Sequence, residues 1–402
     1  MATPACSSGV RAIGYAGATH RGSRDSAYPR ACVPASVRHV NREETLQLLS
    51  RSRRCKSACV VQATGSVSLR EDLFGSKEPL FTDCRSSKVS IVGSGQVGLA
   101  CAYALINQAT CRQIVLHDIA PKMDRLEAEV ADLLHGAEFV DSLDVVATAD
   151  FADTADSDIV IIPAGARQNE GESRLALVAR NVAIFEDIIP KIAAASPDAK
   201  LLILTNPCDI MTHVALRLSG FPSNRVIGSG TALDTSRFRS LLAHKLAVDT
   251  GSVHGMVLGE HGDSSVVLWS QVMVGGVRLK DVHPQLGTGD AEEWLRTLHA
   301  DVVAAAGRII KRKGYTNWAL GLAVNAIVKI IIRDERHILP LSVPAKGRYG
   351  ITQDVHLSLP AMLGSDGVQE IVQVSLSEEE VASLRESARI LAEVQDTIVY
   401  KE

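Results

Sequence analysis

The sequence lacks a continuous apolar segment long enough to cross a membrane. The best candidate, residues 318–332, is shorter than the roughly 20 residues that a spanning helix needs, and Asn325 and Lys329 interrupt it. The sequence also lacks the excess of basic residues typical of a phosphate-binding surface, since its formal net charge is −4. We therefore expect a soluble protein that has neither a membrane nor a nucleic acid as its partner.

Cysteine is sparse beyond residue 63, and so are aromatic side chains. Only Cys84, Cys101, Cys111 and Cys208 lie there, widely spaced, without a CxxC pair or a Cys/His cluster of zinc-binding spacing. A disulfide scaffold and a bound metal are therefore not expected, and the pattern favours a reducing compartment. Aromatic residues are 4% of the 402 positions, so the core must consist mainly of Ala, Val, Leu and Ile.

Acidic residues are scarce in one segment, the N-terminal one. Residues 1–63 hold ten Lys and Arg against three Asp and Glu, a balance of +7, whereas the remainder carries −11. This segment is rich in Ser, Ala and Arg and has no periodic apolar face, which is the composition of a transit peptide. We expect residues 1–64 to be a presequence cut near Ala63, directed to a plastid rather than to a mitochondrion. The alternative is an attached, disordered tail on a cytoplasmic protein.

From residue 88 onward, short apolar runs alternate with helical patterns. The expected strands are 88–93, 113–118, 158–165, 201–207 and 225–228, and the expected helices are 96–108, 121–135, 174–195 and 209–219. Near-continuous Val, Ile and Leu runs are typical of strands that are buried on both faces of a parallel sheet. The pattern predicts an α/β fold with a doubly wound parallel sheet of the Rossmann type over residues 88–230.

Beyond residue 231 the pattern changes to that of an α+β domain, which we expect to span 231–402. A helix is predicted at 232–246, and β-like runs follow at 253–258, 265–274, 354–363 and 368–375. Ser377 and Glu380 form a capping-box pattern that predicts the start of a long C-terminal helix.

A glycine-rich motif lies where the first strand gives way to a helix. The residues that we expect to bind a dinucleotide there are Gly93, Gly95, Gln96, Val97 and Gly98. Such glycines allow a tight turn, a close approach of the backbone to a pyrophosphate and close helix packing. Asp118 ends the next strand, where its carboxylate suits a ribose 2′-hydroxyl and repels a 2′-phosphate. The motif therefore predicts NAD, in preference to NADP, as the cofactor.

Three further polar clusters contain the side chains of an acid/base site. A loop at 164–175 holds Arg167, Gln168 and Arg174, and is either a solvated surface loop or a lid over a substrate. Asp234 and Arg237 lie three residues apart on one helix, the spacing of a common surface ion pair. His261 lies in the glycine-flanked turn 258–265. An imidazole, a carboxylate that orients it and a guanidinium together suit proton transfer on a carboxylate substrate.

These segments resemble the L-lactate dehydrogenases of the lactate/malate dehydrogenase family. The resemblance rests on VGSGQVG, AGARQNEGESRL, GSGTALDTSRFR, HGMVLGEHGDSS and KGYTNWALGLAV, and it runs from about residue 69 to the C-terminus. It implies a Rossmann NAD-binding domain, a second, catalytic domain, and a homotetramer in which an N-terminal arm, here 65–87, wraps a neighbouring subunit.

The resemblance also implies a role for each matching residue. His261 matches the acid/base, Asp234 its partner, Arg237 the arginine that binds the substrate carboxylate and Arg174 the arginine that polarises the carbonyl. The remaining matches are Asn206 near the nicotinamide and substrate, Thr316 in the substrate pocket, Arg167 at the cofactor, and Gln168 at the position that distinguishes substrates.

Two departures and two alternatives accompany this interpretation. Pro163 stands where a threonine is expected, and residues 333–343 match the family pattern loosely. Malate dehydrogenase shares the same apparatus, with Gln168 as the discriminating residue, and a catalytically silent NAD-binding or structural protein is the second alternative. Arg239 and His254 match positions of a phosphosugar effector site in some relatives, but a plain structural role is favoured and regulation is not predicted.

Overall fold

The first half of the described chain is built around a parallel sheet. The computed structural model describes residues 87–141, 144–166 and 174–400. The parallel strands run in the order β3-β2-β1-β4-β5-β6, as expected for a dinucleotide-binding sheet. They are β1 (Lys88–Val92), β2 (Gln113–His117), β3 (Asp144–Thr148), β4 (Ile159–Ile162), β5 (Lys200–Ile203) and β6 (Val226–Gly228).

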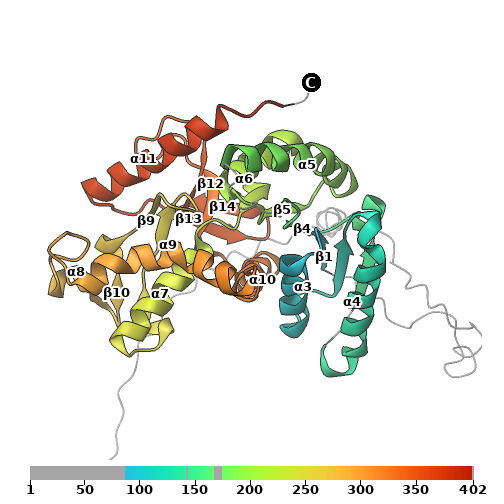
Figure 1. The fold of residues 1–402 in the computed structure, drawn as a ribbon, viewed down its shortest axis with the longest axis horizontal. Coiled ribbons are helices and arrows are strands. Elements are labelled where there is room, and N and C mark those ends of the chain that lie inside the picture. The colour runs from blue at the N-terminus through green and yellow to red at the C-terminus, as the bar shows by residue number, and fades with distance from the viewer. Residues whose placement is uncertain (1–86, 142–143, 167–173, 401–402) are drawn as a thin grey trace, which may run out of the picture. The chain divides into compact units, whose positions relative to one another are not determined.

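Helices cover both faces of this sheet, which explains why its central strands are almost entirely apolar. In Figure 1, α3 lies below the strands and α4 to their right, and α5 and α6 lie above them. The four helices are α3 (Gln96–Asn107), α4 (Met123–His135), α5 (Arg174–Ala195) and α6 (Cys208–Ser219). The α4 helix begins two residues later than predicted, because Pro121 lies in a separate 3₁₀ turn, Ala120–Lys122.

The same sheet continues into the second half of the chain as antiparallel strands. Beyond β6 the order is β12-β13-β8-β9, and β14 pairs with the C-terminal part of β13. Ser342 of β12 pairs with Gly228 of β6. The strands are β8 (Val257–Gly259), β9 (Ser265–Val267), β12 (His337–Pro344), β13 (His356–Gly364) and β14 (Gly367–Ile371). A separate small sheet contains β7 (Val253–His254), β10 (Met273–Val274) and β11 (Val277–Arg278).

The predicted β-like run 265–274 is therefore wrong as one unit. Its ends belong to different sheets, and the 3₁₀ turn Trp269–Gln271 separates them. The strands β3 and β12 were not predicted. Among the apolar residues of β3 only Val145 is buried, because β3 is the edge strand. The strand β12 contains two prolines, Pro340 and Pro344, which weaken a strand pattern.

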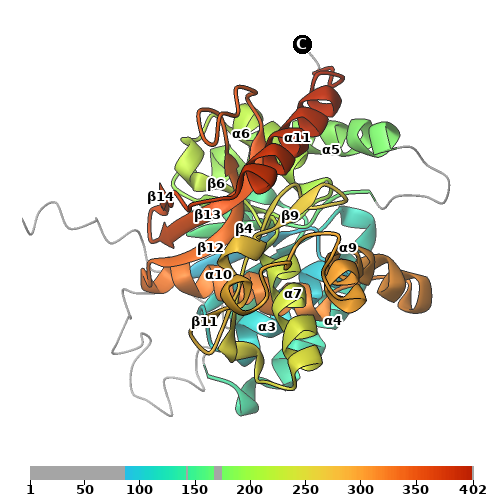
Figure 2. The same ribbon diagram turned by 90° about the vertical axis from the view of Figure 1, so that its left-hand side faces the viewer.

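The remaining helices pack around the second half, as Figures 1 and 2 show. They are α7 (Ala232–Leu246), α8 (Leu279–Val282), α9 (Glu293–Lys313), α10 (Trp318–Arg333) and α11 (Glu378–Gln395). The α10 helix lies against α3 so closely that a Cβ on Gly321 would come within 2.6 Å of the Ala100 carbonyl oxygen. The predicted capping box of α11 is present, with Ser377 and Glu380 bonded reciprocally. No helix among the described residues is both long and apolar enough to cross a bilayer.

Candidate functional site

His261 lies in the turn between β8 and β9, and residues of α6 and β12 hold that turn in place. Its backbone N–H donates to Asp209 Oδ2 at 2.8 Å, and Asp209 belongs to the first turn of α6. The other oxygen of Asp209 accepts from Ser342 Oγ of β12 at 2.5 Å. Asp209 is 2% exposed, so this buried carboxylate links α6 to the turn after β8 and to β12. It fixes the backbone from which the imidazole projects.

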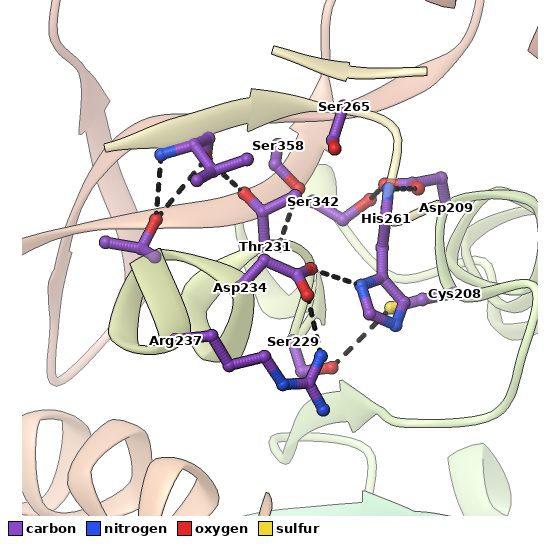
Figure 3. Close-up of polar contacts among 12 residues, drawn as sticks. Cys208, Asp209, Ser229, Thr231, Asp234, Arg237, His261, Ser265, Ser342 and Ser358 are labelled. Atoms are coloured by element: carbon purple, nitrogen blue, oxygen red, sulfur yellow. Dashed lines mark hydrogen bonds and ion pairs between the residues drawn. The ribbon is translucent and has the colours of Figure 1, made fainter. Parts of the chain in front are cut away.

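The carboxylate of Asp234 lies between the imidazole of His261 and the guanidinium of Arg237 (Figure 3). His261 Nδ1 is 2.5 Å from Asp234 Oδ2, and Arg237 Nη1 donates to Asp234 Oδ1 at 2.8 Å. The predicted i,i+3 pair is therefore present, but it is no ordinary surface pair, because the Asp234 side chain is only 9% exposed. The structure brings these three predicted site residues together into one polar cluster.

The charges of this cluster reinforce one another. Burial disfavours the imidazolium form of His261, but the facing carboxylate of Asp234 and, to a smaller extent, that of Asp209 favour it more, so the pKa of His261 is raised. Burial likewise acts to raise the pKa of Asp234, yet His261 and Arg237 outweigh it and hold that pKa below its usual range. The pair can therefore carry a proton on His261 near neutral pH.

The first turn of α7 is anchored beneath this cluster by hydroxyl groups. Thr231 N–H donates to Ser358 Oγ of β13 at 2.9 Å, and the Thr231 hydroxyl donates to the Val257 carbonyl of β8 at 2.5 Å. Thr235 Oγ1 accepts from Val257 N–H at 2.9 Å. These contacts fix Asp234, which lies between the two threonines, relative to the strand that leads to His261.

The glycine-rich motif forms the predicted turn between β1 and α3. Gly93 has a φ of +104°, and a Cβ there would lie 2.6 Å from the Ala164 backbone after β4. A Cβ on Gly98 would lie 2.3 Å from the Gly93 carbonyl oxygen, so α3 packs directly on the turn. The turn, with Gln96 and Val97 in the first turn of α3, therefore needs glycine for both its conformation and its packing.

A cavity of about 340 Å³ begins at this turn and reaches α4. Ser94, Gly95 and Gln96 line one end, and Asp118 with residues of α4 lines the other. A Cβ on Gly95 would meet nothing within 4 Å, so the backbone there faces open space. Exposed backbone at a helix N-terminus next to a carboxylate is the set of groups that a pyrophosphate and a ribose require, so the residues present fit a dinucleotide.

Asn181 of α5 joins two loops of the site, and sequence reasoning missed it. Its side-chain oxygen accepts from Ala166 N–H at 2.7 Å, and its amide donates to the Asn206 carbonyl at 2.7 Å. Asn181 is 1% exposed. A polar residue in an otherwise apolar helical stripe was the available signal, because a buried amide needs partners.

The structure describes some of the other predicted site residues and leaves the rest outside the described ranges. Asn206 is exposed between β5 and α6, three residues before Asp209, and Thr316 is half-buried in the connection between α9 and α10. Pro163 follows β4, where the Thr205 hydroxyl donates to the flanking carbonyls of Ile162 and Ala164. Arg167 and Gln168 lie outside the described residues, as do the expected presequence and arm, and only the backbone of Arg174, the first residue of α5, is described.

Other reactive groups near the cluster do not add chemistry. Burial raises the pKa of the Cys208 thiol to about 12, so it stays protonated. Within the described ranges, no group of three His, Cys, Asp or Glu side chains is arranged to hold a metal ion. Arg239 Nε donates to the Gly255 carbonyl at 2.9 Å, and His254 is exposed in β7.

Comparison with known families accounts for both halves of the fold. The lactate/malate dehydrogenase NAD binding domain matches residues 87–228, and the lactate/malate dehydrogenase alpha/beta C-terminal domain matches residues 231–401. The chain belongs to the lactate/malate dehydrogenase family. The predicted fold class, the family resemblance and the NAD cofactor are thereby confirmed.

Individual relatives within this family are close in sequence. The L-lactate dehydrogenase C chain of Sus scrofa is 49% identical over 315 residues, which cover 78% of this chain and 94% of the relative. The L-lactate dehydrogenase B chain of Squalus acanthias is 46% identical over 314 residues, covering 78% and 93%. The L-lactate dehydrogenase A-like 6B of Bos taurus is 46% identical over 328 residues, covering 81% and 84%.

Proposed function

We propose that this protein is an NAD-dependent L-lactate dehydrogenase that interconverts pyruvate and (S)-lactate. The observation that carries the proposal is the buried Asp234 carboxylate, which is shared by His261 and Arg237 in a chain of this family. The cluster supplies a proton-transfer group and a guanidinium side by side. Similarity to proteins named L-lactate dehydrogenase supports the choice of substrate within the family.

His261 is the acid and base of the proposed reaction. In the direction of reduction, its imidazolium gives a proton to the pyruvate carbonyl oxygen, and in oxidation the neutral imidazole takes the proton of the lactate hydroxyl. Asp234 holds the ring through Nδ1 and stabilises the charged form, which leaves Nε2 as the nitrogen for the substrate. The raised pKa of His261 keeps the proton available near neutrality.

The remaining predicted residues bind and orient the substrate. The planar guanidinium of Arg237 suits a carboxylate with two parallel hydrogen bonds, a geometry that lysine cannot reproduce. Arg174 stabilises negative charge on the carbonyl oxygen, and Asn206 and Thr316 complete the pocket, with Gln168 facing the methyl group of pyruvate. NAD, when bound, supplies or accepts the hydride. The residues that would hold NAD are Gly93, Gly95, Gln96, Val97, Gly98, Asp118, Arg167 and Asn206.

Gln168 provides the test that separates lactate from malate dehydrogenase. Oxaloacetate carries a second carboxylate, and a neutral glutamine does not balance a desolvated charge, which costs several kcal/mol when unpaired. The wild type should therefore prefer pyruvate over oxaloacetate by about two orders of magnitude or more in kcat/KM. Gln168→Arg should invert this preference and also reduce activity with pyruvate, because an unpaired cation would face its methyl group.

Steady-state NADH oxidation with both substrates measures these effects. Gln285→Arg is the matched control, because it makes the same change at an exposed position in the turn before α9. A wild type that favours oxaloacetate would make the protein a malate dehydrogenase. NADH binding without turnover of either substrate would favour the non-catalytic alternative, and an unchanged ratio in Gln168→Arg would remove residue 168 from the substrate pocket.

The proposal extends to assembly and location. We place the protein in a plastid after cleavage near Ala63, as a homotetramer held in part by the arm 65–87; the alternatives are a mitochondrion or the cytoplasm. The basic, acid-poor composition of residues 1–63 supports the presequence, and the family domains match only from residue 87.

Two truncations and a fusion test this extension. A chain that begins at residue 64 should keep its activity and assembly, whereas one that begins at residue 88 should assemble less well. Identical elution of the two in size-exclusion chromatography would rule out the arm. A fluorescent protein fused behind residues 1–70 should enter plastids, and retention in the cytoplasm would disprove the targeting role.

A further inference from the structure

The cavity at the glycine-rich turn has a charged wall that the sequence motif does not reveal. Beyond the turn it is lined by Asp118, by Tyr315 and by four residues of α4 and the turn before it. Those four are Lys122, Arg125, Leu126 and Glu129. If the cavity holds the adenosine end of the cofactor, this wall faces the ribose 2′ position, so the inference below rests on the proposed function.

Lys122 covers the carboxylate that the motif places there. Its ammonium lies 3.0 Å from Asp118 Oδ1 and 3.2 Å from Asp118 Oδ2, so it contacts both oxygens. The Asp118 side chain is 8% exposed, and that of Lys122 is 57% exposed, which places the ammonium on the solvent side of the carboxylate. The 3₁₀ turn Ala120–Lys122 produces this contact by bringing residue 122 back over residue 118.

The charged groups that line the cavity cancel one another. Arg125 pairs with Glu129, with Nη2 to Oε1 at 3.2 Å, as Lys122 pairs with Asp118. These two pairs together sum to zero with Lys122 present and to −1 without it. A lone carboxylate repels a 2′-phosphate, which carries nearly two negative charges. A carboxylate already paired with an ammonium repels it much less.

We propose that Lys122 sets the cofactor selectivity of this chain, and that its ammonium allows the 2′-phosphorylated cofactor to bind in the site that also takes NAD. Lys122 turns towards the phosphate and shares its charge between that group and Asp118. The ribose hydroxyls of NADH still bond to Asp118, so the effect of Lys122 falls mainly on NADPH. Lys122 is a selectivity residue and takes no part in the proton transfer at His261.

The test is direct binding of NADPH and NADH, measured by calorimetric or fluorescence titration at low salt. The readout is the ratio of the Kd for NADPH to the Kd for NADH. One ammonium that faces a doubly charged phosphate in water is worth about tenfold, so Lys122→Met should raise this ratio about tenfold. Lys122→Arg retains the charge and should leave the ratio close to that of the wild type. Added salt should shrink the difference between wild type and Lys122→Met.

A second Lys–Asp pair offers a matched control. Lys191 contacts Asp187 at 2.7 Å with the same i,i+4 spacing, on α5 and outside the residues that line the cavity. Lys191→Met should leave the ratio unchanged. An equal ratio in wild type and Lys122→Met would overturn the selectivity role of Lys122 while NADH binding remained intact. A wild type that does not bind NADH would instead contradict the proposed function.

Discussion

A half-buried histidine, His261, and a fully buried one, His356, lie at neighbouring strands and have opposite surroundings. His261 follows β8, and His356 begins β13, which pairs with β8 through Ser358 and Gly259. The ring of His261 contacts the Asp234 carboxylate. Both ring nitrogens of His356 lack a hydrogen-bond partner among the described residues, and its ring meets that of His213 edge-on, with centroids 5.4 Å apart.

The difference shows that the partner, rather than burial alone, decides the protonation of a histidine. Burial, and then the nearby His213, lower the pKa of His356 to about 3, whereas Asp234 reverses the effect of burial at His261 and raises its pKa. One histidine is therefore prepared to exchange a proton near neutral pH. The other is a neutral packing residue that resists protonation.

Removing the carboxylate should make the first histidine resemble the second. Asp234→Asn keeps the size of the side chain but removes the charge that favours the imidazolium, so the pKa of His261 should fall. We expect kcat for pyruvate reduction to fall by about two to four orders of magnitude, the range for a positioned acid/base. The pH profile of kcat/KM, measured with NADH and pyruvate, should lose its group that titrates near neutrality.

The control for this change is Asp187→Asn, an exposed carboxylate that is also in an ion pair. It should leave the pH profile unchanged. NADH binding by Asp234→Asn should survive, because the predicted cofactor residues are elsewhere. Near-normal turnover in Asp234→Asn would show that the contact with His261 is only structural.

Removing the second histidine should strengthen the protein in acid. The folded-state pKa of His356, about 3, lies below the ordinary value of 6.5, so the unfolded chain binds the extra proton first. Stability is therefore lost progressively as the pH falls from about 6.5 towards 3. His356→Phe removes this loss, and at pH 5 it should gain about 2 kcal/mol relative to the wild type, beyond its effect at pH 8.

Urea unfolding of both chains at pH 8 and pH 5 measures this gain. His337→Phe, at an exposed position at the start of β12, is the control and should show no such pH-dependent gain. An equal loss of stability in the wild type and in His356→Phe on going to pH 5 would mean that His356 titrates freely in the folded protein.

The smallest effect is expected for His213. Burial is the main reason that the pKa of His213 is lowered, but the ring is only half-buried and its Nε2 lies 3.2 Å from Gln395 Nε2. His213→Phe should therefore raise the stability at pH 5 by less than His356→Phe does. The same unfolding series checks the order, and a larger effect for His213→Phe would reverse the assignment of the acid-sensitive residue.

The sequence predicted those elements whose patterns are local. The strand β1, the helices α5 and α7, and the start of α11 with its capping box were predicted within a residue or two, because apolar spacing and capping residues act within a few positions. The strand β12 was missed because its prolines weaken the strand pattern in the sequence. Pairing with β13 nevertheless keeps this segment in the sheet. Asn181 and the buried Asp209 were missed as site residues because their partners lie far away in the sequence.

The sequence alone determined the type of chemistry in this protein. The glycine motif with Asp118 indicated a dinucleotide. The residue types of Asp234, Arg237 and His261, together with the resemblance to the family, indicated an acid/base site. Only the tertiary structure decided how these groups are charged, because Asp234 meets His261 across 27 residues of chain, and a pKa depends on distance and burial rather than on order. The same is true of Lys122, whose contact with Asp118 depends on one short 3₁₀ turn.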